Sequence, residues 1–142
     1  METKKRIPVG EGLFHVPETP GEPPYLIGSK CAACGFVAFP RTLICPSCMN
    51  YHSMERVPLS RRAKLDTFAV LRQAPSGFVA PYVVGYVILP EKTRIFSILT
   101  GVEPRDDALK IGQEMELVIE KIREDEKGNE IIAWKFAPIA TP

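Results

Sequence analysis

The four cysteines of this chain stand in two C-x2-C pairs, and this spacing constrains the fold more than any other feature. Cys31 and Cys34 form the first pair, Cys45 and Cys48 the second, and ten residues separate the pairs. The two-residue gap lets each pair turn around one ion, and four thiolates are the ligand set of a tetrahedral structural zinc site. Because four cysteines leave no open coordination position, the sequence predicts a structural Zn²⁺ and not a catalytic one.

The residues that follow each pair predict how the chain turns around the metal. Gly35 directly after Cys34 suits a tight turn, and Pro46 stiffens the second turn. Met49 stands where a second glycine is expected, so Asn50, which tolerates left-handed φ, is predicted to take over part of that role. Iron is the alternative metal, because four thiolates also hold iron in rubredoxin-like sites. Compact ribbons with closed four-thiolate sites favour zinc.

Length and composition fit a folded protein that stays away from membranes. The 142 residues, 45% of them hydrophobic, allow one domain or one domain with a small appendage. No apolar stretch approaches the ~20 residues of a membrane-spanning helix. No apolar segment follows the basic residues at positions 4–6 either, so we expect no secretory signal and a cytoplasmic location. A reducing compartment favours metal binding over disulfides.

Charge and composition divide the chain into three parts. Residues 1–64 contain nine Lys/Arg and five Asp/Glu, a net charge of +4, whereas residues 65–142 contain nine and twelve, a net charge of −3. Residues 1–24 are rich in proline and glycine, which predicts an extended arm that lies on another part of the fold, with a frayed terminus as the alternative. We predict a zinc ribbon over residues 25–56 and an OB-fold over residues 57–142.

Five segments in the last part show the alternation or the continuous apolar run of β-strands. They are Ala63–Gln73, Tyr82–Leu89, Thr93–Leu99, Glu114–Lys121 and Ile131–Phe136. In the first, one face is predicted to carry Leu65, Thr67, Ala69 and Leu71. In the second, Gly85 predicts a bulge or sharp bend. The fourth has a helical alternative, because Glu, Met, Leu and Lys favour helix, but its apolar residues fall at alternate positions.

One short helix is expected around Asp106–Lys110, ended by Gly112, between the third and fourth strands. Five short strands that must avoid exposed edges close naturally into a small barrel, and a helix after the third strand is typical of an OB-fold. The predicted fold is therefore mainly β, with an N-terminal rubredoxin-like zinc ribbon followed by a five-stranded OB-fold barrel.

Little in the sequence supports catalysis by this chain alone. No cysteine remains as a nucleophile once four bind metal. The two histidines are His15 in the arm, which we expect on the surface, and His52 after the second cysteine pair, which we expect in a solvated loop rather than beside the metal. No phosphate-binding loop, dinucleotide fingerprint or H-E-x-x-H motif occurs. The sequence thus favours a binding module.

Two groups of residues are candidates for contact with a ligand or partner. The first is basic and follows the ribbon: Arg61, Arg62 and Lys64, together with Arg56. These side chains suit phosphates, either of nucleic acid or of a nucleotide-bearing ligand such as coenzyme A, with a solvated surface as the alternative. The second group is apolar and aromatic: Phe78, Pro81 and Tyr82, in the loop 74–82. Exposed apolar groups on a loop indicate a partner or ligand surface, unless they fold back onto the barrel.

Taken together, these motifs resemble the DUF35 family over roughly residues 25–138. The resemblance rests on the cysteine pairs with Gly35, on Phe39-Pro40-Arg41, on the Thr67-Phe68 strand, on Pro81-Tyr82-Val83-Val84 and on Ile111-Gly112. It implies a rubredoxin-like zinc ribbon, an OB-fold and a non-catalytic role beside thiolase-like or related acyl-CoA enzymes. The arm departs from the aromatic-rich helix that opens many members, so contacts made by that helix do not carry over.

The sequence is compatible with three functions. The resemblance implies an accessory subunit of a thiolase-fold enzyme, close to the acyl-CoA entrance, with benzoylsuccinyl-CoA as the favoured single candidate substrate. A nucleic-acid-binding ribbon and OB module is the first alternative, although the net charge of −3 on residues 65–142 disfavours the positive groove that this function needs. A small iron redox carrier is the second alternative.

Overall fold

The computed structural model describes residues 6–10, 12–16, 19, 21–74, 78 and 80–139. Within this part the regular structure consists of ten strands. They are β1 (Arg6–Pro8), β2 (Phe14–His15), β3 (Tyr25–Cys31), β4 (Val37–Ala38), β5 (Met54–Pro58), β6 (Arg62–Leu71), β7 (Tyr82–Ile88), β8 (Arg94–Leu99), β9 (Glu114–Glu124) and β10 (Glu130–Pro138). No helix of the described residues is long and apolar enough to span a membrane.

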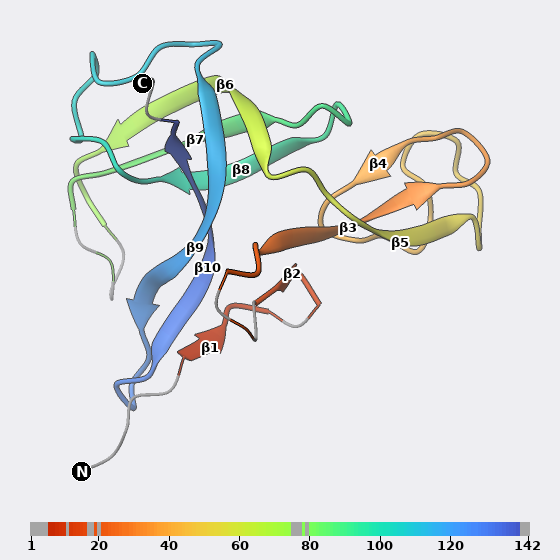
Figure 1. Ribbon diagram of the computed structural model, residues 1–142, viewed down its shortest axis with the longest axis horizontal. Coiled ribbons are helices and arrows are strands. Elements are labelled where there is room, and N and C mark those ends of the chain that lie inside the picture. Colours follow the sequence, from red (N-terminus) through yellow and green to blue (C-terminus); the bar gives the residue numbers. More distant parts are fainter. Residues whose placement is uncertain are drawn as a thin grey trace.

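Five strands close into the barrel that the sequence predicts (Figure 1). β6, β7 and β8 form an antiparallel meander, β9 pairs with β6, and β10 pairs antiparallel with β9 and parallel with β8. This is the pairing of a five-stranded Greek-key OB barrel. Each of the five predicted strand segments coincides with one barrel strand, so the mainly β fold class is confirmed.

The helix predicted around Asp106–Lys110 is wrong. The chain between β8 and β9 forms turns, in which the Ala108 N–H donates to the Arg105 carbonyl at 3.2 Å and the Gln113 N–H to the Lys110 carbonyl at 3.1 Å. Five residues are too few to nucleate a stable helix without packing along one face. Leu109 is the one residue of this stretch that is buried in the core, and a turn suffices to anchor it.

A bulge at Asp66 reverses which side chains of β6 point toward the core in the second part of the strand. Leu65 pairs with Val87 and Thr67 with Tyr86, so Asp66 has no partner of its own. Beyond the bulge Thr67 and Ala69 are exposed and Phe68 packs against the core, which overturns the single face predicted for Leu65, Thr67, Ala69 and Leu71. An extra residue in one strand reverses its alternation, and composition alone does not reveal it.

Gly85 marks the place where β6 and β7 approach most closely. The bulge predicted there lies on the opposite strand, at Asp66. A Cβ atom at position 85 would overlap the backbone carbonyl oxygen of Thr67 and lie 3.0 Å from the Leu99 side chain. Glycine is therefore required by the backbone approach that the bulge creates.

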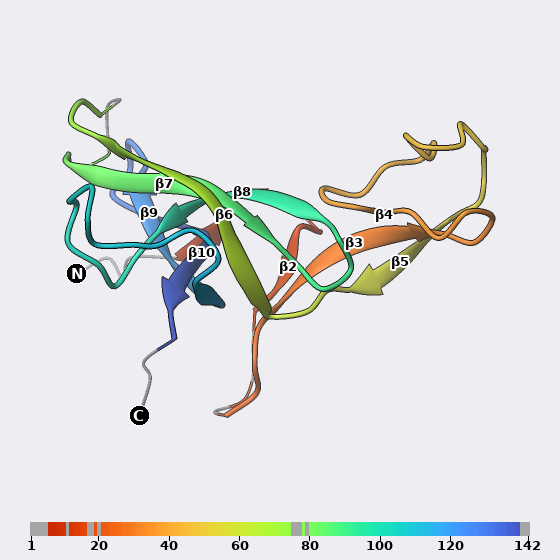
Figure 2. The ribbon, with the colours of Figure 1, turned by 90° about the horizontal axis from the view of Figure 1, so that it is seen from above.

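The ribbon is a small second sheet that projects from the barrel (Figures 1 and 2). Its central strand β3 pairs with β4 on one side and with β5 on the other. β5 continues to Pro58, past the predicted division between residues 56 and 57. The first half of β3 belongs to the barrel's core, because Leu26 is fully buried there together with Leu59. One strand thus connects the core with the distal ribbon.

Trp134 of β10 holds the ribbon and the arm against the barrel. Its ring meets Phe39 edge-on, with centroids 5.1 Å apart, and Phe14 at 6.4 Å. Its indole N–H donates to the Phe96 carbonyl at 2.9 Å, which fixes the ring against β8. A hydrogen bond of 3.2 Å from the Thr93 hydroxyl to the Val37 carbonyl adds a second link between barrel and ribbon.

The described parts of the arm run extended along both sheets. β1 pairs parallel with the first half of β10, and β2 pairs antiparallel with β3. Phe14 inserts into the shared core, where it is 8% exposed. His15 is half-buried, not free on the surface as expected, because it bonds to Glu22 and stacks on Tyr25 at 4.8 Å. Positions 1–5, 11, 17, 18 and 20 of the predicted arm lie outside the described residues.

Replacing Gly85 by alanine is expected to destabilise the barrel by about 3 kcal/mol, because a backbone oxygen cannot move aside as a flexible side chain can. Gly10→Ala is the control, since its new Cβ would meet only the flexible end of Leu13. Urea unfolding monitored by Trp134 fluorescence gives both free energies. Equal stabilities for the two variants would contradict the close approach.

Candidate metal centre

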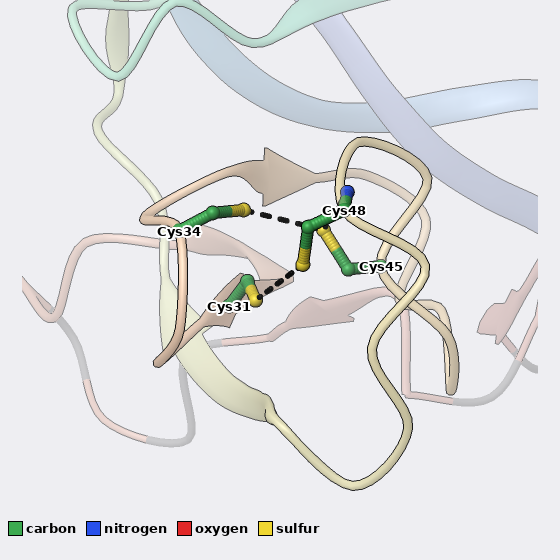
Figure 3. Close-up of side chains that lie close together, drawn as sticks. All are labelled: Cys31, Cys34, Cys45 and Cys48. Atoms are coloured by element: carbon green, nitrogen blue, oxygen red, sulfur yellow. Dashed lines mark hydrogen bonds between the residues drawn. The ribbon is translucent and has the colours of Figure 1, made fainter.

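The structure brings the four cysteine sulfurs together at the far end of the ribbon (Figure 3). All four Sγ atoms lie within 4.8 Å of one another, with Cys31 and Cys48 at 3.7 Å and Cys34 and Cys45 at 3.5 Å. Four sulfurs at the zinc–thiolate bond length around a tetrahedral ion lie about 3.8 Å apart. The donor set and the spacing therefore fit a structural metal, consistent with zinc.

Two similar turns position the sulfurs. Cys31 ends β3 and Cys34 lies in the turn before β4, where the Gly35 N–H donates to the Cys31 carbonyl at 2.8 Å. In the second turn the Met49 N–H donates to the Cys45 carbonyl at 2.9 Å, and the Cys48 N–H points to the Cys45 sulfur at 3.4 Å. N–H groups directed at sulfur stabilise the thiolate form that binds metal.

The left-handed residue of the second turn differs from the prediction. Gly35 has a φ of 84° as expected, but in the second turn Met49 itself adopts a φ of 61°, and Asn50 does not take over its role. The N–H of residue 49 donates to the Cys45 carbonyl just as the Gly35 N–H donates to the Cys31 carbonyl. Residue 49, and not residue 50, is therefore the one that must adopt the left-handed conformation. A side chain in this region costs about 1 kcal/mol relative to glycine.

The thiols differ in their surroundings even though they converge. Cys31 and Cys45 are buried, whereas Cys34 and Cys48 face solvent. A hydrogen bond with the Ser53 hydroxyl at 3.2 Å contributes most to lowering the pKa of Cys31 to about 6. The Asn50 backbone N–H lowers the pKa of Cys48, but partial loss of water around the sulfur and the neighbouring thiols outweigh it and raise that pKa to about 12. In the absence of a cation the four groups therefore resist ionising together.

The basic candidate residues line a groove on the barrel. Arg62 and Lys64 on β6 border a groove of about 460 Å³ whose apolar part is formed by Ile88, Leu89 and Pro90, with Glu114 at its edge. Neither cation has an ion-pair partner in the described part of the chain. Arg61 lies 3.9 Å from Glu116 and is half-exposed. The structure thus brings Arg62 and Lys64 together and pairs Arg61 elsewhere.

The aromatic candidates lie at the opposite end of the β6–β7 hairpin. Phe78 and Tyr82 stack with centroids 6.1 Å apart and border a second groove of about 460 Å³. Pro81 is exposed beside them, and positions 75–77 and 79 of the loop lie outside the described residues. Tyr82 begins β7 and Ile88 ends it, so the two grooves are separated by the length of the strand, about 20 Å.

The second groove also contains three cations that the sequence did not predict to lie there. Lys121, Arg123 and Lys135 border it, and come from β9 and β10. Glu124 pairs with Lys121 at 2.7 Å and Glu120 lies 3.5 Å from Lys135. In sequence these residues belong to an acidic half of the chain, and only the pairing of β9 with β10 and of β10 with β8 brings them to the aromatic loop.

Neither histidine is a member of the sulfur cluster. His52 is exposed on the ribbon, as expected, with a φ of 63°. His15 is engaged by Glu22 and Tyr25. All four cysteines belong to the sulfur cluster, so none is available to either histidine as a nucleophile.

Fold and site define a protein with a rubredoxin-like zinc ribbon and an OB-fold barrel. Family models match both parts: the ChsH2 rubredoxin-like zinc ribbon domain over residues 20–49 and the ChsH2 C-terminal OB-fold domain over residues 56–120. A benzoylsuccinyl-CoA thiolase subunit, BbsA, from Thauera aromatica is 39% identical over 84% of this chain and 80% of its own length. A DUF35 domain-containing scaffold protein from Methanothermobacter thermautotrophicus is 37% identical over 80% of this chain and 86% of its own.

A solved structure agrees with these relatives. The Ltp2-ChsH2(DUF35) aldolase contains a chain that superposes with a TM-score of 0.65 and 28% identity, covering 80% of this chain and 84% of its own. The chain described here belongs to the DUF35 family. The resemblance drawn from the sequence motifs is thereby confirmed.

Cys31→Ser is expected to lose the metal and unfold the distal ribbon while the barrel stays largely folded. Metal analysis should fall from about one zinc per chain to almost none, because an alcohol does not replace a thiolate ligand. The single tryptophan, Trp134, reports the change, since loss of Phe39 from its ring exposes it and shifts its emission to longer wavelengths. Ser47→Ala, at an exposed position in the second turn, is the control. Unchanged zinc content in Cys31→Ser would refute the ligand assignment.

Proposed function

We propose that this chain is a non-catalytic zinc-containing accessory subunit of a thiolase-type enzyme that acts on an acyl-CoA thioester. The observation that carries the proposal is that one closed metal site uses every cysteine of the chain. Thiolase chemistry requires a nucleophile and a proton-transfer group held together. Both would come from the partner subunit, and this chain supports the assembly and the substrate entrance.

The relatives support the same assignment. Two of them are named as subunits of benzoylsuccinyl-CoA thiolase, from Thauera aromatica and from Geobacter metallireducens, and both are similar to this chain over more than four-fifths of its length. Others are named as scaffold proteins. A thiolase-fold partner in a hetero-oligomer, and benzoylsuccinyl-CoA as candidate substrate, are the specific forms of the proposal for this chain.

Contact with the CoA thioester at the subunit interface is a further part of this proposal. The groove at Arg62 and Lys64 offers two cations that have no ion-pair partner among the described residues, beside an apolar floor, which suits a phosphate next to an apolar group. The groove at Phe78 and Tyr82 offers a stacked aromatic pair among cations, with Pro81 exposed beside it. Arg61 precedes Arg62 in the sequence but forms an ion pair with Glu116.

The alternatives have less support. A nucleic-acid-binding module needs a continuous basic groove, but in this structure the cations occupy two separate grooves and several are paired with carboxylates. An iron carrier would share the sulfur geometry, and visible absorbance of the purified protein distinguishes it, because a ferric four-thiolate site is coloured and zinc is not.

The proposal is tested by purifying the chain from its native source under mild conditions. We expect a thiolase-type subunit, identified by mass spectrometry, to accompany it in a defined ratio. Thiolysis of a CoA thioester should require both subunits, because neither the zinc chain alone nor the catalytic subunit alone forms the complete enzyme. Recovery of this chain as a free monomer, with full activity in the other subunit alone, would overturn the proposal.

Reversing the two charges of the first groove is expected to weaken substrate binding. In Arg62→Glu/Lys64→Glu, the KM for the CoA thioester should rise about tenfold with kcat changed less than twofold, since the cations touch phosphate and not the reacting atoms. Lys110→Glu/Lys127→Glu makes the same change of charge at exposed sites elsewhere and should leave KM unaltered. Equal effects of both double variants would show that only net charge matters.

A further inference from the structure

The distal ribbon exposes large apolar side chains that the chain itself does not cover. Leu43 is 89% exposed, and Met49 and Tyr51 are each 65% exposed. Leu43 and Tyr51 flank a groove of about 360 Å³, here called the tip groove, which is lined by Thr42, Leu43, Ile44, Tyr51, His52 and Met54. The bridge between Ile44 and Tyr51 fixes the backbone on its two sides. Exposed apolar groups gathered at a groove mark an interaction surface.

The backbone beside the tip groove carries strain that glycine at the same positions would not carry. Met49 and His52 both adopt left-handed φ values, 61° and 63°, without being glycine. The first cysteine turn shows that glycine serves in the equivalent place, since Gly35 has a φ of 84°. The Met49 side chain adds strain and is largely in solvent, so it contributes little to folding. Residues whose backbone is strained, and whose side chains do not stabilise the fold, are typical of functional surfaces.

The position of the groove leaves it open to another molecule. The ribbon points away from the barrel in both views, and the chain between β4 and β5 runs along the ribbon to its outer end (Figures 1 and 2). Nothing among the described residues packs over Leu43. The described part of the arm does not cover the groove, because it is paired with β10 and β3.

The charge of the ribbon indicates the chemistry of the occupant. Residues 25–56 contain three cations, Lys30, Arg41 and Arg56, and one anion, Glu55, a net charge of +2. None of the three cations has an ion-pair partner in the part of the chain that the structure describes. An apolar groove on a ribbon that carries a net positive charge is complementary to an apolar protrusion on a partner surface that carries carboxylates.

We propose that the tip groove is the docking site for the catalytic subunit, which inserts an apolar side chain between Leu43 and Tyr51 and presents carboxylates to the ribbon cations. This inference rests on the proposed function and adds to it the face through which the two subunits meet. In this arrangement the exposed Met49 side chain also contacts the partner. The metal centre then acts by holding the groove in shape.

The test measures stability and partner binding on the same variants. Leu43→Asp should leave the thermal midpoint of the free chain unchanged and weaken the affinity for the catalytic subunit at least tenfold. Met49→Gly should leave the midpoint unchanged or raise it, because strain is relieved, yet should weaken the affinity severalfold. Opposite effects of one substitution on stability and on binding are not expected of a merely structural residue. Ile111→Asp is the control, since Ile111 is 63% exposed on the barrel.

The outcomes separate this inference from the proposed function. If the wild-type chain binds the catalytic subunit and Leu43→Asp binds equally well, the docking site is wrong and the accessory role stands. If the wild-type chain does not bind the catalytic subunit, both are overturned. If the wild-type chain self-associates and Leu43→Asp makes it monomeric without changing binding to the catalytic subunit, the groove is an interface between copies and the inference is again overturned.

Discussion

The bond between four thiolates and one cation is the interaction on which the distal half of this molecule depends. Between residues 28 and 58 the buried apolar side chains are only Cys31, Ala38 and Cys45, and two of these three are metal ligands. So small a core does not offset the conformational entropy of ordering some thirty residues. Metal binding replaces apolar burial there, because its free energy is available only when the chain folds around the ion.

β3 transmits this local order to the rest of the protein. Its last residue, Cys31, is a ligand, and its second residue, Leu26, is fully buried in the core shared with Leu59 and Phe14. Trp134 adds a lateral contact, since one ring packs on Phe39 of the ribbon and Phe14 of the arm while its N–H is held by β8. The ribbon is therefore fixed to the barrel at its near end and held by the metal at its far end. Packing against the barrel sets the orientation of the ribbon, and metal coordination sets the conformation of its tip.

The sequence was most informative where one residue type has one dominant use. The cysteine spacing predicted the sulfur cluster, and alternating or continuous apolar residues predicted the five barrel strands. The failures share a cause, since each depends on contacts distant in sequence. The bulge at Asp66 reverses β6 through its pairing with β7, and the single anchor Leu109 replaces the predicted helix. Lys121, Arg123 and Lys135 meet Phe78 and Tyr82 only after the barrel closes. Met49 shows a subtler limit, because its unusual identity was visible but its left-handed conformation was not.

Stabilisation by metal also changes what the surface of the ribbon can carry. In the barrel a large apolar side chain contributes to stability mainly by facing inward, so Leu65, Val87 and Phe136 are almost completely buried. In the ribbon the folding free energy comes from coordination, and apolar side chains are not all needed inside. Leu43, Met49 and Tyr51 can therefore face solvent without weakening the fold, and a strained turn at Met49 is tolerated because the preceding ligands, Cys45 and Cys48, hold it. A closed structural metal site, which performs no chemistry of its own, thus allows a small sheet to present an apolar surface that a metal-free sheet of this size would have to bury.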